Sequence, residues 1–66
     1  MSPHREAEKA LKQAGYIVKR TTGGHAIWYN ARLGATITLK NHDFNDNDLK
    51  YIIKEIRQAE ERTRGK

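Results

Sequence analysis

Apolar residues recur with two different periods along the chain of 66 residues, and the first period to appear is that of a helix. A thin stripe of four apolar residues begins at Ala7 with the spacing i, i+3, i+4 and i+7. Ser2 followed by Pro3 is a typical helix start, because a hydroxyl caps the end and proline suits the first helical position. Gly15 is a typical helix stop. The sequence therefore predicts a helix over about residues 3–14.

A second helical stripe, the strongest period of the chain, runs from Leu49 to Ile56 with the same spacing. Asn45 or Asp46 is placed to cap its N-terminus, where acidic residues also favour the positive end of the helix. The basic segment 61–66 carries no apolar stripe, and we expect it to fray. A helix is therefore predicted between the polar loop that follows the third apolar segment and this tail.

Three short segments between the helices are rich in aromatic and β-branched residues, which is typical of strands. They are "YIVKRTT" (residues 16–22), "HAIWYN" (25–30) and "ATITLK" (35–40). In the last of them apolar and polar residues alternate, as expected of a half-buried strand. Gly23 and Gly24 form the first turn. Since the connections are short, the strands should form an antiparallel meander.

These elements predict an α+β fold of order αβββα, with two helices on one face of a three-stranded antiparallel sheet. The chain is long enough for one domain, which we place at residues 1–66 with an ordered part of about 3–60. The predicted core residues are Leu11, Ala14, Ile17 or Val18, Ile27, Ile37, Leu39, Leu49, Ile52, Ile53 and Ile56.

Charge is distributed unevenly and favours an anionic partner such as nucleic acid. The net charge is +5, and all eight acidic residues lie outside residues 16–40. The basic residues of that acid-free region are predicted phosphate contacts; they are Lys19, Arg20, Arg32 and Lys40. No cysteine is present, which excludes disulfides and thiolate zinc sites. No apolar run is long enough to span a membrane, and we expect a cytoplasmic protein.

The side chains that remain favour one kind of chemistry. Ser2 is the single serine and lies at the terminus, so a serine or cysteine hydrolase is not expected. His4, His25 and His42 are far apart, and we expect neither a metal site nor a cofactor. Cleavage of RNA needs no nucleophile from the protein, because the nucleophile is the 2′-OH of the substrate. A histidine moves the protons, and basic side chains stabilise the developing charge.

The step Gly23-Gly24-His25 has two interpretations. Two glycines allow the backbone to approach a phosphodiester, at which the imidazole would then point. Alternatively, the glycines form a plain hairpin turn and His25 is an exposed residue at the end of a strand. If Ile27 faces the helices, Trp28 lies on the exposed face and can stack on a base. The alternative is that Trp28 closes an incomplete core.

A resemblance bears on this choice. The segment "ALKQAGYIVKRTTGGHAIWYN" resembles the N-terminal half of the HicA family of toxin–antitoxin mRNA interferases. The features that carry the resemblance are Gly15-Tyr16, Gly23-Gly24-His25, Trp28, His42 and the closing helix "LKYIIKEIRQA". It covers roughly residues 7–59. The resemblance implies a fold like that of double-stranded-RNA-binding domains, His25 as the catalytic residue and a HicB-type antitoxin as partner.

The sequence therefore leads to two hypotheses. The first is a metal-independent endoribonuclease, monomeric when free, that cleaves mRNA with His25 as general acid or base. The RNA-binding residues predicted with it are Lys19, Arg20, Gly23, Gly24, Trp28, Arg32, Lys40 and His42. The second hypothesis is a non-catalytic RNA-binding or protein-interaction module on the same fold.

Overall fold

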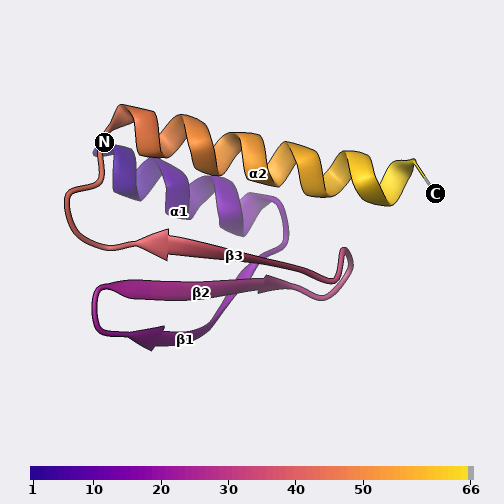
Figure 1. Cartoon of the computed structure of the whole chain (residues 1–66), viewed down its shortest axis with the longest axis horizontal. Helices are drawn as coiled ribbons and strands as arrows, with labels where there is room; N and C mark the ends of the chain where they lie inside the picture. The colour runs from indigo at the N-terminus through magenta and orange to yellow at the C-terminus, as the bar shows by residue number, and fades with distance from the viewer. Residues whose placement is uncertain (66) are drawn as a thin grey trace.

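Five elements follow one another in the order helix, three strands, helix (Figure 1). The computed structural model describes residues 1–65. The elements are α1 (Pro3–Gln13), β1 (Ile17–Thr22), β2 (His25–Asn30), β3 (Ala35–Lys40) and α2 (Asp46–Arg64). The predicted α+β class and the order αβββα are confirmed.

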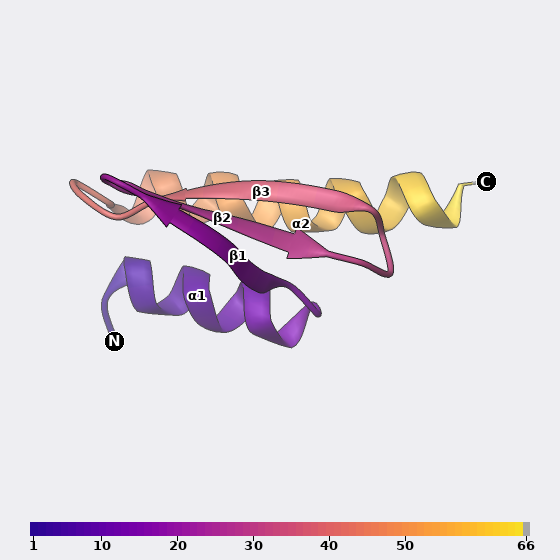
Figure 2. The ribbon, with the colours of Figure 1, turned by 90° about the horizontal axis from the view of Figure 1, so that it is seen from below.

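The sheet is an antiparallel meander of strand order β1-β2-β3. Both helices lie on the β3 side of the molecule in Figure 1, and β1 is the strand furthest from them. Figure 2 shows that α1 lies to one side of the sheet. Side chains of both helices pack with side chains of β2 and β3 in one core. One face of the sheet is therefore covered, and the opposite face is left open.

Both ends of α1 form as the sequence predicts. The Ser2 hydroxyl accepts a hydrogen bond from the backbone N–H of Arg5 at 3.2 Å, and Pro3 is the first helical residue. After the helix, Gly15 takes a φ of +97°, a conformation that other residues rarely adopt. The chain thereby turns from the helix into β1.

A reciprocal pair of hydrogen bonds fixes the start of α2. The Asn45 side chain accepts from the backbone N–H of Asp48 at 3.1 Å, and the Asp48 carboxylate accepts from that of Asn45 at 2.9 Å. The helix continues to Arg64, beyond the point where fraying is predicted to begin. Ala59 is buried there, and the Thr63 hydroxyl donates to its carbonyl at 3.1 Å. Lys66 lies outside the described residues.

The core agrees with the prediction in β3 and partly in the helices, where Ala14, Leu49 and Ile56 are only partly buried and Ile53 lies outside the core cluster, but it differs in β1 and β2. Leu11, Ile37, Leu39 and Ile52 are buried as predicted. The predicted facing of β2 is wrong, because Trp28 is 1% exposed and belongs to the core. The remaining members of this core are Ala7, Tyr16 and Ala26.

Register explains the facing of β2. Trp28 lies opposite Ile37 and Ala26 lies opposite Leu39. Cross-strand partners share a face of the sheet, so the inward residues of β3 determine which residues of β2 point inward. Ile27, which was expected in the core, therefore lies on the open face and is half-buried.

Strand β1 contributes no buried side chain. Ile17 is 67% and Val18 46% exposed, whereas one of them was expected in the core. Every residue of β1 is exposed, since this edge strand is the one furthest from both helices. Tyr16, which precedes the strand, is buried in their place.

Asn30 ties the end of α1 to the turn between β2 and β3. Its side chain is 1% exposed, and its amide group donates to the Ala14 carbonyl at 2.8 Å. Its side-chain oxygen accepts from the Leu33 backbone N–H at 3.0 Å. A buried amide with both ends paired holds two segments in a fixed relation.

Candidate functional site

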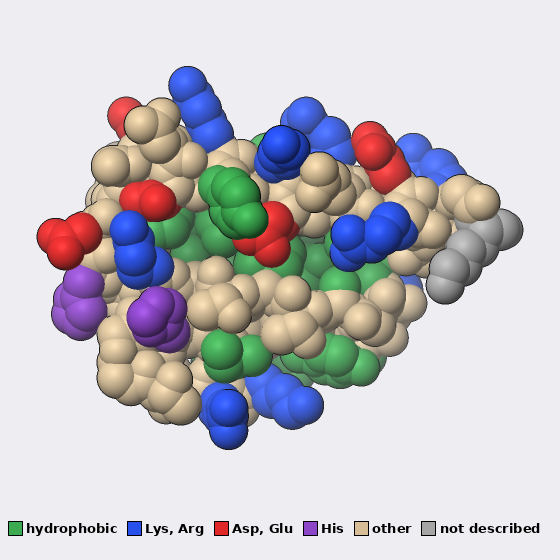
Figure 3. Space-filling model, viewed as in Figure 1, with side chains coloured by type: hydrophobic (Ala, Val, Ile, Leu, Met, Phe, Trp, Pro, Cys, Tyr) green, Lys and Arg blue, Asp and Glu red, His purple; other side chains and the backbone are tan. Residues whose placement is uncertain are grey.

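The face of the sheet that the helices leave uncovered is defined by the strand register, and we refer to it as the open face. Its residues are Ile17, Lys19, Arg20, Thr22, His25, Ile27, Tyr29, Thr36, Thr38 and Lys40. None of them is acidic, because no strand carries an acidic residue. In the space-filling view, Lys and Arg side chains lie along the β1 side of this face (Figure 3). The open face is therefore positively charged, hydroxyl-bearing and partly apolar.

A bulge in β1 places two consecutive basic residues on the open face. The register shifts between Val18 and Arg20, so that Lys19 has no direct partner in β2. Arg20 lies opposite Ile27 and shares its face. The Lys19 ammonium lies 5.3 Å from the centre of the Tyr29 ring, which belongs to the same face. Regular alternation would have sent one of the two cations to the covered side.

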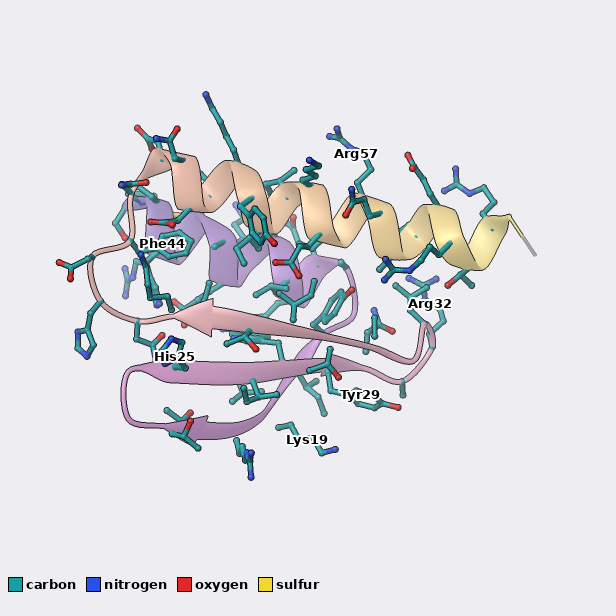
Figure 4. All side chains as sticks on the ribbon, in the orientation of Figure 1. Lys19, His25, Tyr29, Arg32, Phe44 and Arg57 are labelled. Atoms are coloured by element: carbon teal, nitrogen blue, oxygen red, sulfur yellow. The ribbon has the colours of Figure 1, made fainter. Side chains whose placement is uncertain are left out.

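Tyr29, and not Trp28, is the aromatic residue of the open face. Trp28 is buried against the helices, and the prediction that it lies on the exposed face and stacks on a base is wrong. Tyr29 is half-buried and carries Lys19 over its ring, as Figure 4 also shows. An aromatic ring beside a cation is the arrangement on which single-stranded nucleic acids stack.

His25 is exposed as the first residue of β2. Its cross-strand neighbours are Thr22 of β1 and Lys40 of β3. The Lys40 ammonium lies 3.4 Å from a carboxylate oxygen of Asp48 in α2, and the Lys40 side chain is 43% exposed. The backbone N–H of Asn45 and then Lys40 lower the pKa of the Asp48 carboxyl. A basic side chain paired with Asp48 therefore lies opposite His25 in the sheet.

Gly24 brings a second histidine to this end of the sheet. The backbone N–H of Asn41 donates to the Gly24 carbonyl at 2.7 Å and extends the ladder past Lys40. A Cβ on Gly24 would stand 2.9 Å from Cδ2 of His42, so the imidazole lies against the glycine α-carbon. We call the group of Gly24, His25, Lys40 and His42 the histidine end. Histidine side chains gather at the corresponding end of the face in Figure 3.

His4, to which the sequence analysis assigned no role, holds the loop that carries His42. Its Nε2 and the side-chain oxygen of Asn41 are 2.9 Å apart, and its ring meets Phe44 edge-on with centroids 5.5 Å apart. Its Nδ1 also lies 3.6 Å from the Glu8 carboxylate. Contacts on both sides of His42 therefore anchor the loop to α1. No signal in the sequence points to this long-range pairing.

Arg32 lies in the turn after β2, at the opposite end of that strand from His25. Its guanidinium forms an ion pair with Glu60 of α2, with N–O distances of 2.7 and 3.5 Å. The hydrogen bond from Arg32 lowers the pKa of the Glu60 carboxyl, and Glu60 raises that of Arg32. The structure thus separates Arg32 from the residues of the histidine end.

Further features of the described chain bear on the chemistry. A hollow between α1 and α2, lined by Ala10, Ile53 and Arg57 among others, contains no residue of the histidine end. Within residues 1–65, no three His, Asp or Glu side chains are grouped so as to hold a metal ion. In the same range, neither helix is long and apolar enough to cross a membrane. His25 lies on an open surface, which suits an extended polymer better than a small molecule.

These features define a small αβββα domain with a basic sheet face and an exposed histidine at the start of the central strand. The model of the family described as HicA toxin of bacterial toxin–antitoxin systems matches residues 4–60. The chain belongs to the HicA toxin family, as the resemblance implies, and this membership implies an antitoxin partner. No curated protein and no solved structure matches the chain.

Proposed function

We propose that this toxin is an endoribonuclease that cleaves mRNA at the histidine end without a metal ion. The observation that carries the proposal is the position of His25, which is exposed on a sheet face whose strands carry no acidic residue and lies directly opposite Lys40 of β3. Histidine is the side chain suited to proton transfer near neutral pH. A positive, open surface is suited to a polyanion.

In the proposed reaction the 2′-oxygen of one nucleotide attacks the adjacent phosphorus. The O2′–P bond forms while the P–O5′ bond breaks, so the products are a 2′,3′-cyclic phosphate and a 5′-hydroxyl. One proton leaves the 2′-OH and one joins the departing 5′-oxygen, and His25 transfers one of them as general base or acid. Lys40 stabilises the negative charge that develops on the phosphoryl oxygens.

The open face also supports an account of RNA binding. In this proposal Lys19, Arg20 and Lys40, which share the open face, contact phosphates of an RNA strand that runs across the sheet, and a base stacks on Tyr29. Gly23 has a φ of +50° in the hairpin turn beside His25. In this proposal the two glycines, which have no side chains of their own, let backbone amides of the turn approach the scissile phosphate.

The antitoxin that family membership implies is, in this proposal, of HicB type, and it covers the open face. A partner that neutralises Lys19 and Arg20 presents acidic side chains, because opposite charges guide association and set specificity. RNA and antitoxin would then compete for one surface. Blocking of RNA cleavage by a bound antitoxin follows from that overlap.

Purified wild-type protein incubated with end-labelled single-stranded RNA in EDTA tests the proposal. We expect cleavage, and fragments that carry 2′,3′-cyclic phosphate or 3′-phosphate ends together with 5′-hydroxyl ends. RNA that is bound but never cut would instead support the non-catalytic binding module. Fragments with 5′-phosphate ends would exclude attack by the 2′-OH and hence this mechanism.

A further inference from the structure

We propose that His42 is a second catalytic residue, and that it forms an acid–base pair with His25. This inference rests on the proposed function and adds a residue to it. One imidazole accepts the proton of the 2′-OH while the O2′–P bond forms. The other, as an imidazolium, delivers a proton to O5′ while the P–O5′ bond breaks, and exchange with water restores both.

The chemistry needs two groups in this place. Proton removal at O2′ and proton delivery at O5′ occur on opposite sides of the phosphorus, and a single ring cannot serve both in one step. Histidine is the residue type that both accepts and donates protons near neutral pH. The open face provides His25 for one transfer, and the histidine end adds His42 for the other.

The position of His42 follows from the way the chain turns after β3. The bond from Asn41 to the Gly24 carbonyl fixes the loop beside the turn that precedes His25. The ring edge of His42 then rests on Gly24, with Nε2 3.7 Å from the place of a Cβ. Both His25 and His42 are exposed, and one residue, Gly24, links the backbone of the first to the ring of the second.

The loop that carries His42 is anchored at both ends, as an acid–base group requires. Asn41 is hydrogen-bonded to His4, and Phe44 packs edge-on against the same ring. Between them, Asp43 takes a φ of +54° and makes the loop compact. The backbone that carries His42 is therefore held in place before substrate arrives, which is how binding geometry contributes to rate.

Gly24 has a specific role in this arrangement. Its φ is not in the left-handed region, so its backbone would accept an alanine, whereas the methyl group would meet His42 at 2.9 Å. The ring is an exposed side chain and would move away. Gly24→Ala therefore displaces His42 without removing either histidine or the fold.

A substrate with a 5′-thio leaving group tests the pair, because thiolate leaves without being protonated. On ordinary RNA, His25→Ala and His42→Ala should each lose about 10²- to 10⁴-fold in rate. On the thio substrate, one of the two variants should recover to nearly the wild-type rate and the other should not. Measured RNA affinity should stay within about threefold of wild type in His42→Ala, since phosphate contacts carry the binding.

Gly24→Ala gives an independent check through a double-mutant cycle. It should slow cleavage in the wild-type background but have no further effect when combined with His42→Ala. Wild-type rates for both His42→Ala and His42→Gln would overturn the pair while leaving His25 and the proposed function intact. Equal defects of both histidine variants on both substrates would also overturn it. Failure of the wild type to cut either RNA would overturn the proposed function, and the pair with it.

Discussion

His25 and Trp28 lie three residues apart in β2 and on opposite faces of the sheet. His25 is exposed on the open face, whereas Trp28 is 1% exposed and packs beneath it with the helices. The side chain proposed to be catalytic is therefore carried on a strand whose other side forms the centre of the core. A small domain has few rigid places, and its central strand is one of them.

Tyr29 lies on the open face and Trp28 lies in the core. This arrangement predicts how substitutions at the two positions affect RNA binding. Tyr29→Ala should weaken affinity for single-stranded RNA by about 1–3 kcal/mol, the usual contribution of one stacked base. Tyr29→Phe, the matched control, keeps the ring and should bind as the wild type does. Trp28→Phe should lower the melting temperature but not the affinity. A loss of affinity in Trp28→Phe at a temperature where it is folded would contradict this assignment.

The salt dependence of RNA affinity should distinguish Lys19 and Arg20, the two cations of the bulge, from Arg32. Each phosphate contact adds about −0.7 to the slope of log K against log salt for single strands. Lys19→Gln and Arg20→Gln should each flatten the slope by about that amount. Arg32→Gln should leave it unchanged, because Arg32 lies in the turn after β2 and is paired with Glu60 of α2. Equal effects of all three would indicate diffuse attraction and not a defined path for RNA.

Asn30 should be among the most sensitive positions for stability. Asn30→Ala leaves the Ala14 carbonyl and the Leu33 N–H without their partner, and each unpaired buried group costs about 1–3 kcal/mol. For a domain of this size such a loss approaches the whole free energy of unfolding. Urea titration followed by circular dichroism measures it. Asn47→Ala, at an exposed position of α2, should change stability by less than about 0.5 kcal/mol.

Acid should destabilise the fold through two half-buried carboxyls of α2, those of Asp48 and Glu60. Hydrogen bonds lower the pKa of Asp48 from 3.8 and that of Glu60 from 4.5. A group whose pKa is lower in the folded state stabilises the fold above its unfolded pKa, and this contribution is lost as pH falls through the folded value. Asp48→Asn and Glu60→Gln should therefore flatten the fall of melting temperature below pH 5.

The acid prediction has an internal control. The hydrogen bond from Arg32 is the largest cause of the lowered pKa of Glu60, so Arg32→Gln should also flatten the fall of melting temperature at acid pH. Once Arg32 is replaced, Glu60→Gln should have little further effect. Additive effects of the two substitutions would show that the pair does not couple to folding. If the melting temperature of both single variants fell at acid pH as steeply as that of the wild type, the role given to the pair would be wrong.

The sequence predicted the order of elements, both helix starts and the inward face of β3, because each depends on neighbouring residues. It did not predict the facing of β2, which has apolar residues on both sides. The necessary signal was present in the turn between β2 and β3. A four-residue turn over 31–34 places Asn30 opposite Ala35 and hence Trp28 opposite Ile37, whose direction was already known.

Other features of the site depend on contacts that no local pattern encodes. The bulge that turns Lys19 toward Tyr29 follows from pairing between whole strands. The contact of His42 with Gly24 joins residues from two different turns, and His4 anchors the loop from α1. Such relations arise only when the packed chain brings distant residues together. The sequence therefore identified His25, Gly24, Lys40 and His42 as candidates but not the contacts that join them.

The rate of RNA cleavage by His25→Ala, measured in single-turnover experiments with EDTA present, tests the central claim most directly. His25 is exposed at a strand end, so its replacement should leave the melting temperature and the RNA affinity close to those of the wild type. The cleavage rate should fall by about 10²- to 10⁴-fold. Cleavage by His25→Ala at the wild-type rate, with an intact fold and unchanged RNA affinity, would contradict the account.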